Sequence, residues 1–277
     1  MAYVKNRRRE YPNLAHAIVN WTLRRHGVSA ADTSYDAKNA FHSIFLHILE
    51  EEMEKVARPE DLHLLIQRIR LAVITVRTRQ GMVNFMIGQG ALPGDALAAH
   101  MFRITYRRAV GEWIEDNRRH RWGEALLTYD PITGREVDLA MTVYADDVRK
   151  TTPVERADEL PELLKKQDEK LTQVLSKIGV AQSSSKKEHA LSVFGAKSGE
   201  TLRAIKRGKT VVQGKVLRHM VVLGSVTHNN GSVEPELKAR MQTANSGWFI
   251  MGAFWTSTVR LRTRLMIFFC HSLQCVN

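Results

Sequence analysis

The chain has 277 residues and a formal net charge of +12 at pH 7, with 44% hydrophobic and 25% charged residues. These proportions are ordinary for a soluble globular protein, and the excess of Lys and Arg favours polyanionic partners, most often nucleic acid. The two cysteines, Cys270 and Cys275, fit neither a disulfide framework nor a four-ligand zinc site. No apolar run reaches the ~18–20 residues of a membrane span, and no signal peptide is recognisable, so an intracellular protein without a membrane partner is predicted, in the nucleus or the cytoplasm.

The first half of the chain is predicted to be mainly helical, with one short extended run around residues 34–36. Apolar residues at helical spacing, proline at first-turn positions and glycine at the ends of the apolar stretches mark the boundaries. A loop is predicted over residues 88–94, where glycine and proline cluster. The predicted helices cover residues 13–26, 39–56, 62–76 and 95–120.

The second half combines short strands with two helices. A hairpin region is predicted over residues 126–150, with a turn at 130–134 and a strand over 137–143. Leucine and valine at helical spacing predict a helix over residues 160–178 that Gly179 ends. Further strands are expected near 189–194, 210–213 and 216–227, and a last helix over 234–248. Helices mixed with short antiparallel strands predict an α+β fold, with a sheet packed on helices.

The tetrapeptide Tyr144-Ala145-Asp146-Asp147 carries the clearest chemical signal in the sequence. Two adjacent carboxylates follow an apolar run, and a buried charge without a partner is strongly disfavoured. Hard divalent cations such as Mg²⁺ are held by one or two carboxylates together with phosphate oxygens. The pair therefore predicts a cation site, and a solvated turn is the plainer alternative.

Two-metal phosphoryl chemistry needs carboxylates from a second segment, because two ions ~3.5–4 Å apart hold the attacking and leaving oxygens. Asp36 is the candidate, since it ends a short extended run and precedes an amphipathic helix. A helix N-cap is its ordinary alternative. Asp32 is the nearby competitor, but it lacks the aromatic residue five positions later that Asp36 has in Phe41.

Asp36-x-x-x-x-Phe41, followed by the Tyr-x-Asp-Asp run, resembles the A and C motifs of reverse transcriptases. Residues 92–102 (LPGDALAAHMF) resemble the B motif of that family, and residues 179–188 resemble its D region with a lysine. Residues 223–244 are similar to the segment that follows the palm in non-LTR (LINE-type) retrotransposon polymerases. The resemblance covers roughly residues 34–265 and implies a polymerase palm.

The resemblance implies a metal-binding role for the three aspartates. Asp36 and Asp146 would hold two Mg²⁺ ions, with Mn²⁺ as the alternative, and Asp147 would assist. The backbone carbonyl of Ala37 would add a ligand.

The remaining roles implied by the resemblance concern the nucleotide, the template and the leaving group. Lys186 or its neighbour Lys187 would approach the pyrophosphate. Phe41 would lie under the incoming sugar as a steric gate against a 2′-hydroxyl. The loop Pro93-Gly94-Asp95 would let the backbone approach template and nucleotide, as glycine permits. Tyr144 belongs to the same nucleotide- and template-binding set.

The implied function is that of an RNA-directed DNA polymerase domain, complete or degenerate, which adds dNTPs to a DNA primer on an RNA template. The expected organisation is a residual fingers segment or N-terminal extension over 1–30, a palm over 31–232 and a truncated start of the thumb over 233–277. A non-catalytic basic RNA- or DNA-binding remnant of a retroelement is the alternative. Tyr144 and Phe41 argue against a third reading, an RNA-dependent RNA polymerase.

Overall fold

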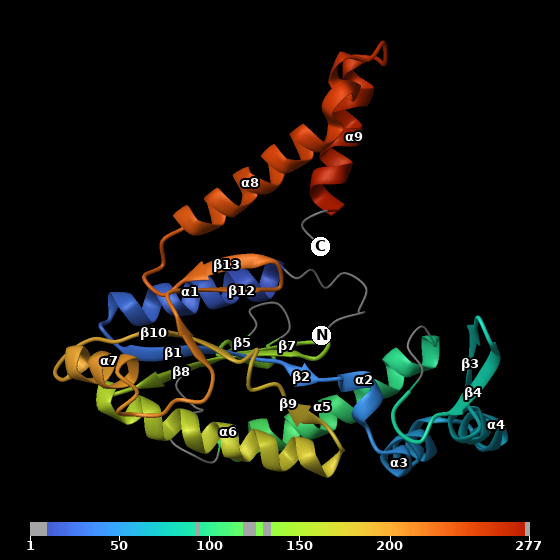
Figure 1. Ribbon diagram of the computed structural model, residues 1–277. Helices are drawn as coiled ribbons and strands as arrows, with labels where there is room; N and C mark the ends of the chain where they lie inside the picture. The colour runs from blue at the N-terminus through green and yellow to red at the C-terminus, as the bar shows by residue number, and fades with distance from the viewer. Residues whose placement is uncertain (1–9, 92–94, 119–125, 130–133, 275–277) are drawn as a thin grey trace.

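The computed structural model describes residues 10–91, 95–118, 126–129 and 134–274 (Figure 1). Its centre is a five-stranded sheet with the strand order β11-β10-β1-β8-β7. Neighbouring strands are antiparallel except β10 and β11, which are parallel. The strands are β1 (Ser29–Tyr35), β7 (Met141–Tyr144), β8 (Asp147–Val154), β10 (Glu188–Ser192) and β11 (Lys215–Leu217).

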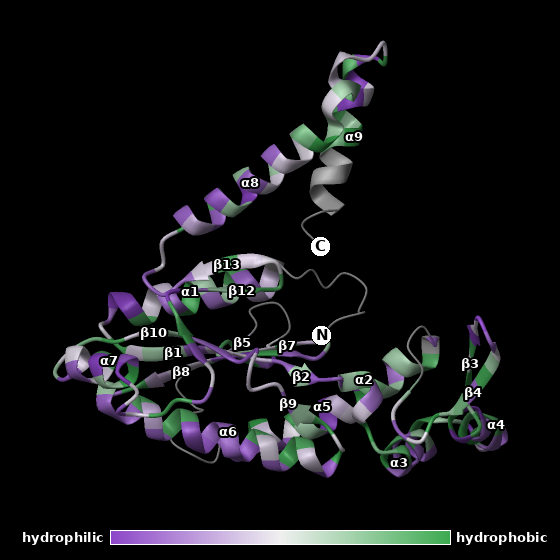
Figure 2. Ribbon diagram, viewed as in Figure 1, coloured by the Kyte–Doolittle hydropathy of each residue, from purple (hydrophilic) through white to green (hydrophobic). Residues whose placement is uncertain are grey.

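Helices α5 (Ala96–Arg118) and α6 (Leu160–Lys177) cover one face of the sheet (Figure 1). Hydrophobic and hydrophilic residues alternate along α6 at helical spacing (Figure 2), so one side of the helix can be buried and the other solvated. Trp113 of α5 is fully buried and meets Tyr35 of β1 edge to face, with the ring centroids 5.6 Å apart. Its indole N–H donates to the Gln167 carbonyl of α6 at 3.1 Å, so this tryptophan joins both helices to the sheet.

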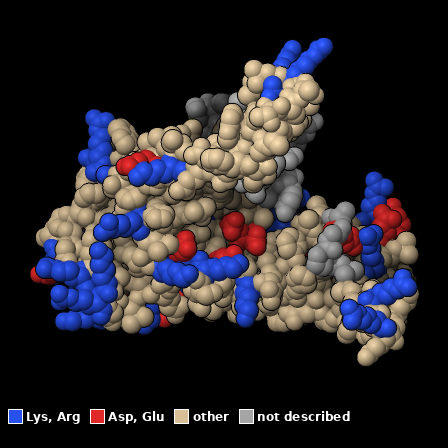
Figure 3. Space-filling model, turned by 45° about the horizontal axis from the view of Figure 1, so that its top comes forward, with Lys and Arg blue, Asp and Glu red and all other residues tan. Residues whose placement is uncertain are grey.

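A lobe and an arm extend from this central body in different directions (Figure 1). The lobe contains α2 (Ala40–Ser43), α3 (Leu46–Val56), α4 (Pro59–Arg70) and the hairpin of β3 (Val73–Thr78) and β4 (Gly81–Met86). The arm consists of α8 (Glu234–Met251), the 3₁₀ turn at Gly252–Thr256 and α9 (Leu261–Gln274). Lys and Arg side chains spread over the face shown in Figure 3, along the body and at the top of the arm, around a compact acidic group.

Smaller elements complete the described part of the chain. The two-residue strands β2 (Ala37–Lys38) and β9 (Ala181–Gln182) pair beside the main sheet. The others are α1 (Glu10–Arg25), β5 (Leu127–Tyr129), β6 (Glu136–Asp138), the 3₁₀ turn Ala157–Glu159, α7 (Ser198–Lys206), β12 (His219–Val222) and β13 (Ser225–His228). None of the helices in these described ranges has the length and apolarity needed to cross a lipid bilayer.

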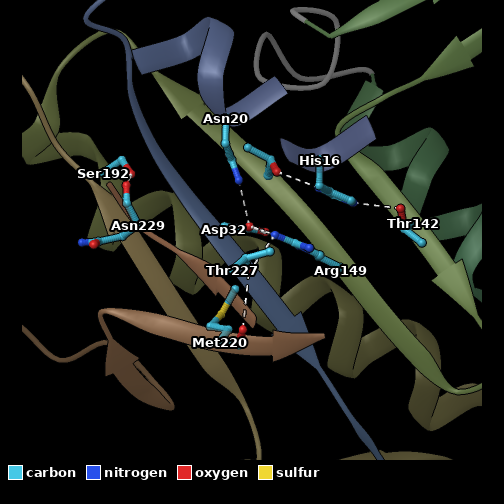
Figure 4. Close-up of polar contacts among 10 residues, drawn as sticks. His16, Asn20, Asp32, Thr142, Arg149, Ser192, Met220, Thr227 and Asn229 are labelled. Carbon is cyan, nitrogen blue, oxygen red and sulfur yellow. Dashed lines mark hydrogen bonds and ion pairs between the residues drawn. The ribbon is translucent and has the colours of Figure 1, made fainter. Parts of the chain in front are cut away.

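The second face of the sheet is held to α1 and β13 by polar contacts (Figure 4). Asp32 of β1 and Arg149 of β8 form a buried ion pair, with Arg149 Nε 2.9 Å from Asp32 Oδ1. Asn20 of α1 donates to Asp32 at 3.1 Å, and Arg149 donates to the Thr227 hydroxyl of β13 at 3.2 Å. Burial favours protonation of Asp32, but the Arg149 charge and hydrogen bond outweigh it and hold the pKa below its usual value.

The predicted α+β class is confirmed, and the predicted helices over 160–178 and 234–248 are present as α6 and α8. The continuous helix predicted over 39–56 is wrong, because Ile44 and Phe45 adopt extended backbone angles between α2 and α3. Their backbone groups bond outside the helix. The Phe45 N–H donates to the Ile178 carbonyl at 3.1 Å, and the Gly90 N–H donates to the Ile44 carbonyl at 2.8 Å.

Three other local predictions also fail. The helix predicted over 62–76 ends at Arg70, because the β-branched run at residues 73–76 favours the strand that it forms in β3. The strand predicted over 137–143 is divided between β6 and β7. Residues 210–213 are not a strand, since pairing with β10 begins only at Lys215, and α7 is a helix that was not predicted.

His16 of α1 provides a test of this second face. Its ring nitrogens lie 3.1 Å from the Thr151 hydroxyl and 2.8 Å from the Thr142 hydroxyl, and the side chain is fully buried (Figure 4). Burial, and after it the charge of Arg149, lowers the pKa of His16 to about 4 against the opposing effect of Asp32. The imidazole is therefore neutral in the folded protein at pH 5, where an exposed histidine is charged.

We expect the free energy of unfolding to fall by about 2 kcal/mol between pH 7 and pH 4.5 through His16 alone, because the unfolded chain binds a proton at this histidine while the folded chain remains mostly unprotonated there. His16→Gln should remove this part of the pH dependence. The matched control is His26→Gln, which changes an exposed histidine. Urea unfolding at both pH values gives the measurement, and an equal pH dependence in all three proteins would contradict the buried neutral state.

Candidate active site

The register between β1 and β8 brings two of the predicted aspartates together. Tyr35 pairs with Val148 at the last step of this antiparallel ladder. The next residues along the two strands are Asp36 and Asp147, which therefore lie across from each other at one end of the sheet. Both side chains are only partly buried, so the site opens to solvent.

The third aspartate lies in the turn between β7 and β8. Tyr144 pairs with Asp147, which leaves Ala145 and Asp146 as a two-residue hairpin loop. Ala145 has a φ of +56°, in the left-handed region that such tight loops use. This conformation is unfavourable for alanine, so the hairpin holds Asp146 beside Asp147 against a local backbone preference.

The three carboxylates share one electrostatic environment. Burial, then the charges of Asp146 and Asp36, raises the pKa of Asp147 to about 6, and Lys186 opposes this shift. Interactions between charges fall with distance and with solvent screening. The charges of Asp36 after β1 and of Asp146 in the β7–β8 turn therefore both act on the Asp147 carboxylate.

Tyr106 of α5 lies behind this region and donates from its hydroxyl to the Asp146 carbonyl at 3.2 Å. Burial, followed by the charges of Asp146, Asp147 and Asp36, raises its pKa well above the usual value. The sequence does not single out this residue, because it lies in the apolar stripe of α5 and stacks on Phe102 at a centroid distance of 5.0 Å. The polar hydroxyl of a tyrosine within an apolar stripe was the sequence signal that could have indicated a specific contact.

The two candidate lysines have different surroundings. Lys186 Nζ lies 3.2 Å from Asp36 Oδ2, so this residue faces the carboxylates. Lys187 is buried, forms an ion pair with Asp168 of α6, and has its Nζ 5.7 Å from the centre of the Tyr35 ring. Lys187 therefore stabilises the packing of α6 on the sheet, and Lys186 is the lysine that remains a candidate for the chemistry.

The oxygen ligands fit a hard divalent cation in chemical type. Asp36 Oδ2 is buried and accepts no hydrogen bond, and the Lys186 ammonium lies 3.2 Å away, so this oxygen already faces a positive charge as a ligand of a cation would. Among the described residues, however, no three His, Cys, Asp or Glu side chains lie close enough together to hold a metal ion. The spacing of Asp36, Asp146 and Asp147 is thus not that of a metal-loaded cluster.

The predicted nucleotide-binding residues are distributed around the carboxylates. Ala37 is buried and pairs with Gln182 directly after Asp36. Phe41 is partly buried and packs on Phe102 of α5, with the ring centroids 4.5 Å apart. Tyr144 is half-buried at the end of β7.

The predicted template-contacting loop is described only in part. Pro93 and Gly94 lie outside the described residues. The Asp95 carboxylate accepts two hydrogen bonds from Arg68, at 3.0 and 2.9 Å, and one from the Leu97 N–H at 2.9 Å. Asp95 thus caps the first turn of α5, and its role toward template or nucleotide stays a prediction.

Comparison with known proteins gives matches only among solved structures, since no protein-family model and no curated protein matches the chain. Apo telomerase from Candida tropicalis, truncated from its C-terminal domain, aligns with a TM-score of 0.53 and 16% identity over 80% of this chain and 39% of that chain. Telomerase from Candida albicans in complex with a TWJ fragment of telomeric RNA aligns with a TM-score of 0.52 and 11% identity over 99% of this chain.

These matches establish the class of fold. The chain spans about two fifths of the length of the telomerase chains, 39% of one and 42% of the other. At such low identity the likeness is one of fold alone. The chain therefore has an α+β fold, with an antiparallel-dominated sheet packed on helices, that is similar to the fold of these telomerase chains.

Two glycines allow the close packing that fixes Phe41. The Ala91 N–H donates to the Phe41 carbonyl at 2.9 Å. A Cβ on Gly90 would lie 2.4 Å from His42 Cα, and a Cβ on Gly179 would lie 2.4 Å from the Ser43 carbonyl oxygen. Both glycines also have positive φ, +77° and +84°. The chain around residues 41–43 is thus held between two backbone segments with no space for a side chain.

Gly90→Ala should lower the free energy of unfolding by about 2–4 kcal/mol, because the methyl group meets backbone atoms and alanine disfavours this φ. Gly88→Ala is the matched control, since a Cβ there meets nothing within 4 Å. Urea denaturation of both variants gives the comparison. A Gly90→Ala loss no larger than that of Gly88→Ala would show that this backbone contact is looser than described.

The pKa of Asp147 gives a direct test of the carboxylate grouping. In metal-free buffer we expect its carboxyl group to titrate at about pH 6, measured by carbon-13 NMR of labelled aspartate. Asp36→Asn should lower this pKa, because a nearby negative charge is removed, and Lys186→Met should raise it, because a nearby positive charge is removed. An unchanged pKa in both variants would mean that Asp147 is not near these side chains in solution.

Proposed function

We propose that the chain is an RNA-directed DNA polymerase domain of a retroelement, which joins dNTPs to a primer 3′-hydroxyl along an RNA template. The observation that carries the proposal is the meeting of Asp36 with Asp146 and Asp147 at the ends of β1 and β8, on a polymerase-like fold. Two-metal nucleotidyl transfer needs carboxylates from two chain segments at one position.

In the proposed mechanism Asp36 and Asp146 would hold two Mg²⁺ ions, and Asp147 would assist. When bound, the ions supply charge stabilisation for the attacking and leaving oxygens. Tyr106 keeps the β7–β8 turn in place through its hydrogen bond to the Asp146 carbonyl. Lys186 would interact with the anionic leaving group, and the Ala37 carbonyl would contribute one more oxygen.

Nucleotide selection in the proposal rests on Phe41. Its ring packs on Phe102, and its backbone is fixed by the loop at Gly90 and Ala91. A ring in a fixed position can exclude a 2′-hydroxyl sterically, whereas a loosely held ring would yield to it. The close backbone packing around residues 41–43 therefore supports a gate role.

The proposed nucleic-acid partners are an RNA template and a DNA primer. A net charge of +12 and the Lys and Arg side chains spread over the face in Figure 3 suit a phosphate backbone. Two of the structural neighbours are telomerases in complex with a fragment of telomeric RNA, which is consistent with a nucleic-acid ligand. Template identity would come from base pairing, so no base-reading motif is required.

The LINE-type assignment rests on residues 223–244. Here the β12–β13 hairpin leads into α8, and the Glu236 carboxylate accepts from the Val226 N–H at 2.6 Å and from Arg240 at 2.7 Å. Arg240 also donates to the Gly224 carbonyl at 3.0 Å. Glu236 and Arg240, two of the residues on which the resemblance rests, thus join α8 to the β12–β13 hairpin. This structural role explains why both residue types occur in the pattern.

A non-catalytic RNA- or DNA-binding remnant is the second candidate. It is favoured by one observation: a lysine, not a set of converging ligands, neutralises Asp36. On that reading the basic surface keeps its affinity for nucleic acid while the carboxylates no longer load metal.

Primer extension separates the two candidates. With an RNA template, a DNA primer, dNTPs and Mg²⁺, we expect extension by the full chain, a loss of at least about 100-fold in Asp146→Asn, and none in EDTA. Asp61→Asn, which changes an exposed aspartate on α4, is the control. Absence of extension with retained binding that weakens steeply with salt would favour the remnant instead.

A further inference from the structure

Asp36 already has a cation beside it, supplied by the chain itself. Lys186 Nζ lies 3.2 Å from Asp36 Oδ2, and the lysine side chain is 69% exposed while that of Asp36 is 22% exposed. The same Oδ2 atom is buried and accepts no hydrogen bond. The ammonium group is therefore the partner of the very oxygen that the proposed function offers to a divalent ion.

The backbone that carries Lys186 is fixed to the Asp36 segment. The Ser183 N–H donates to the Asp36 carbonyl at 2.8 Å, and the Lys186 and Lys187 N–H groups donate to the Ser183 carbonyl at 3.2 and 3.1 Å. The Lys187 side chain anchors this turn through its buried ion pair with Asp168. The flexible part is thus the Lys186 side chain, whose four-carbon stem can swing without moving the backbone.

An ammonium group at this position and a divalent ion exclude each other. A Mg²⁺ ion binds its oxygen ligands at ~2.0–2.1 Å, and a cation that close to Asp36 Oδ2 would repel the neighbouring ammonium. An ion pair whose lysine is largely exposed contributes little to stability, so a divalent ion can displace it. With the lysine in place, Asp36 Oδ2 is not free to act as a ligand of a divalent ion.

We propose that Lys186 is the resident counter-ion of the carboxylate site, which holds Asp36 in the absence of a divalent ion and is displaced when one binds. The inference rests on the proposed function and adds to it how the site is neutralised before it is loaded. Lys186 lowers the affinity for the first divalent ion, and metal binding frees its amine to face solvent or an anionic ligand.

The experiment measures Mn²⁺ binding to the full chain, by electron paramagnetic resonance of the free ion, without nucleotide or nucleic acid. Lys186→Met should lower the Kd for Mn²⁺ about fivefold, because a competing cation is removed. Lys38→Met is the matched control. Lys38 is an exposed lysine two residues from Asp36, and its side chain forms no ion pair within the described part of the structure. It should leave the Kd within twofold.

Amine labelling of the wild-type chain gives an independent readout. Saturating Mn²⁺ should increase acetylation of Lys186, scored by mass spectrometry, and leave Lys38 unchanged. An unchanged Kd in Lys186→Met together with unchanged labelling overturns the inference, while loss of Mn²⁺ binding in Asp36→Asn would leave the proposed metal site standing. Mn²⁺ binding that Asp36→Asn does not weaken overturns the metal site and the counter-ion together.

Discussion

The antiparallel register between β1 and β8 is the constraint on which the rest of the structure depends. Tyr35 opposite Val148 places Asp36 across from Asp147 at the end of the ladder. A slip of one residue in either strand would exchange the two faces of that strand. A slip in β8 would move the Arg149 side chain to the face covered by α5 and α6, and a slip in either strand would mean that Asp36 and Asp147 no longer lie across from each other.

Burying β8 costs desolvation free energy, because this strand carries charged side chains on both faces. Arg149 faces α1 and is neutralised by Asp32, which lies on the same face of β1. Lys150 faces the other way, with its Nζ 4.9 Å from the centre of the Trp113 ring, and burial lowers its pKa to about 8. The buried ion pair and the cation–π contact each fix which face a side chain occupies, so the charges specify the register as well as costing desolvation.

The carboxylate site depends on a balance of repulsion and support. The charges of Asp146 and Asp36 add to burial in raising the pKa of Asp147, and a group of like charges would separate if nothing opposed it. Three contacts oppose it here: the strand register, the Tyr106 hydrogen bond to the Asp146 carbonyl, and the Lys186 ion pair. The first two involve the backbone of the strands and of the β7–β8 turn, whereas the lysine contact is made by an exposed side chain. This difference between the contacts is the basis of the proposed exchange of Lys186 for a divalent ion.

The sequence predicts the parts of this arrangement whose signal is local. The stripe from Leu160 to Ile178 gives α6 because helical period and capping agree, and the apolar run before Asp146 gives the strand that presents it. The break at Ile44 and Phe45 could not be predicted, since the groups that cause it, Gly90 and Ile178, are distant in sequence. The role of Tyr106 could not be predicted for the same reason, because the carbonyl that its hydroxyl binds is 40 residues away in the sequence.

Asp32 and Asp36 show how closely stability and chemistry lie together in this sheet. Both belong to one segment, and a sequence pattern alone can assign either to the metal. Their positions along the strand separate them, because Asp32 lies within β1 and pairs with Arg149, while Asp36 follows the end of β1 and lies across from Asp147. Arg149 in turn stands two residues from Asp147 on β8 and also donates to Thr227 of β13. Loss of that ion pair would therefore act on the site indirectly, by weakening the register of β8 and the contact with the β12–β13 hairpin.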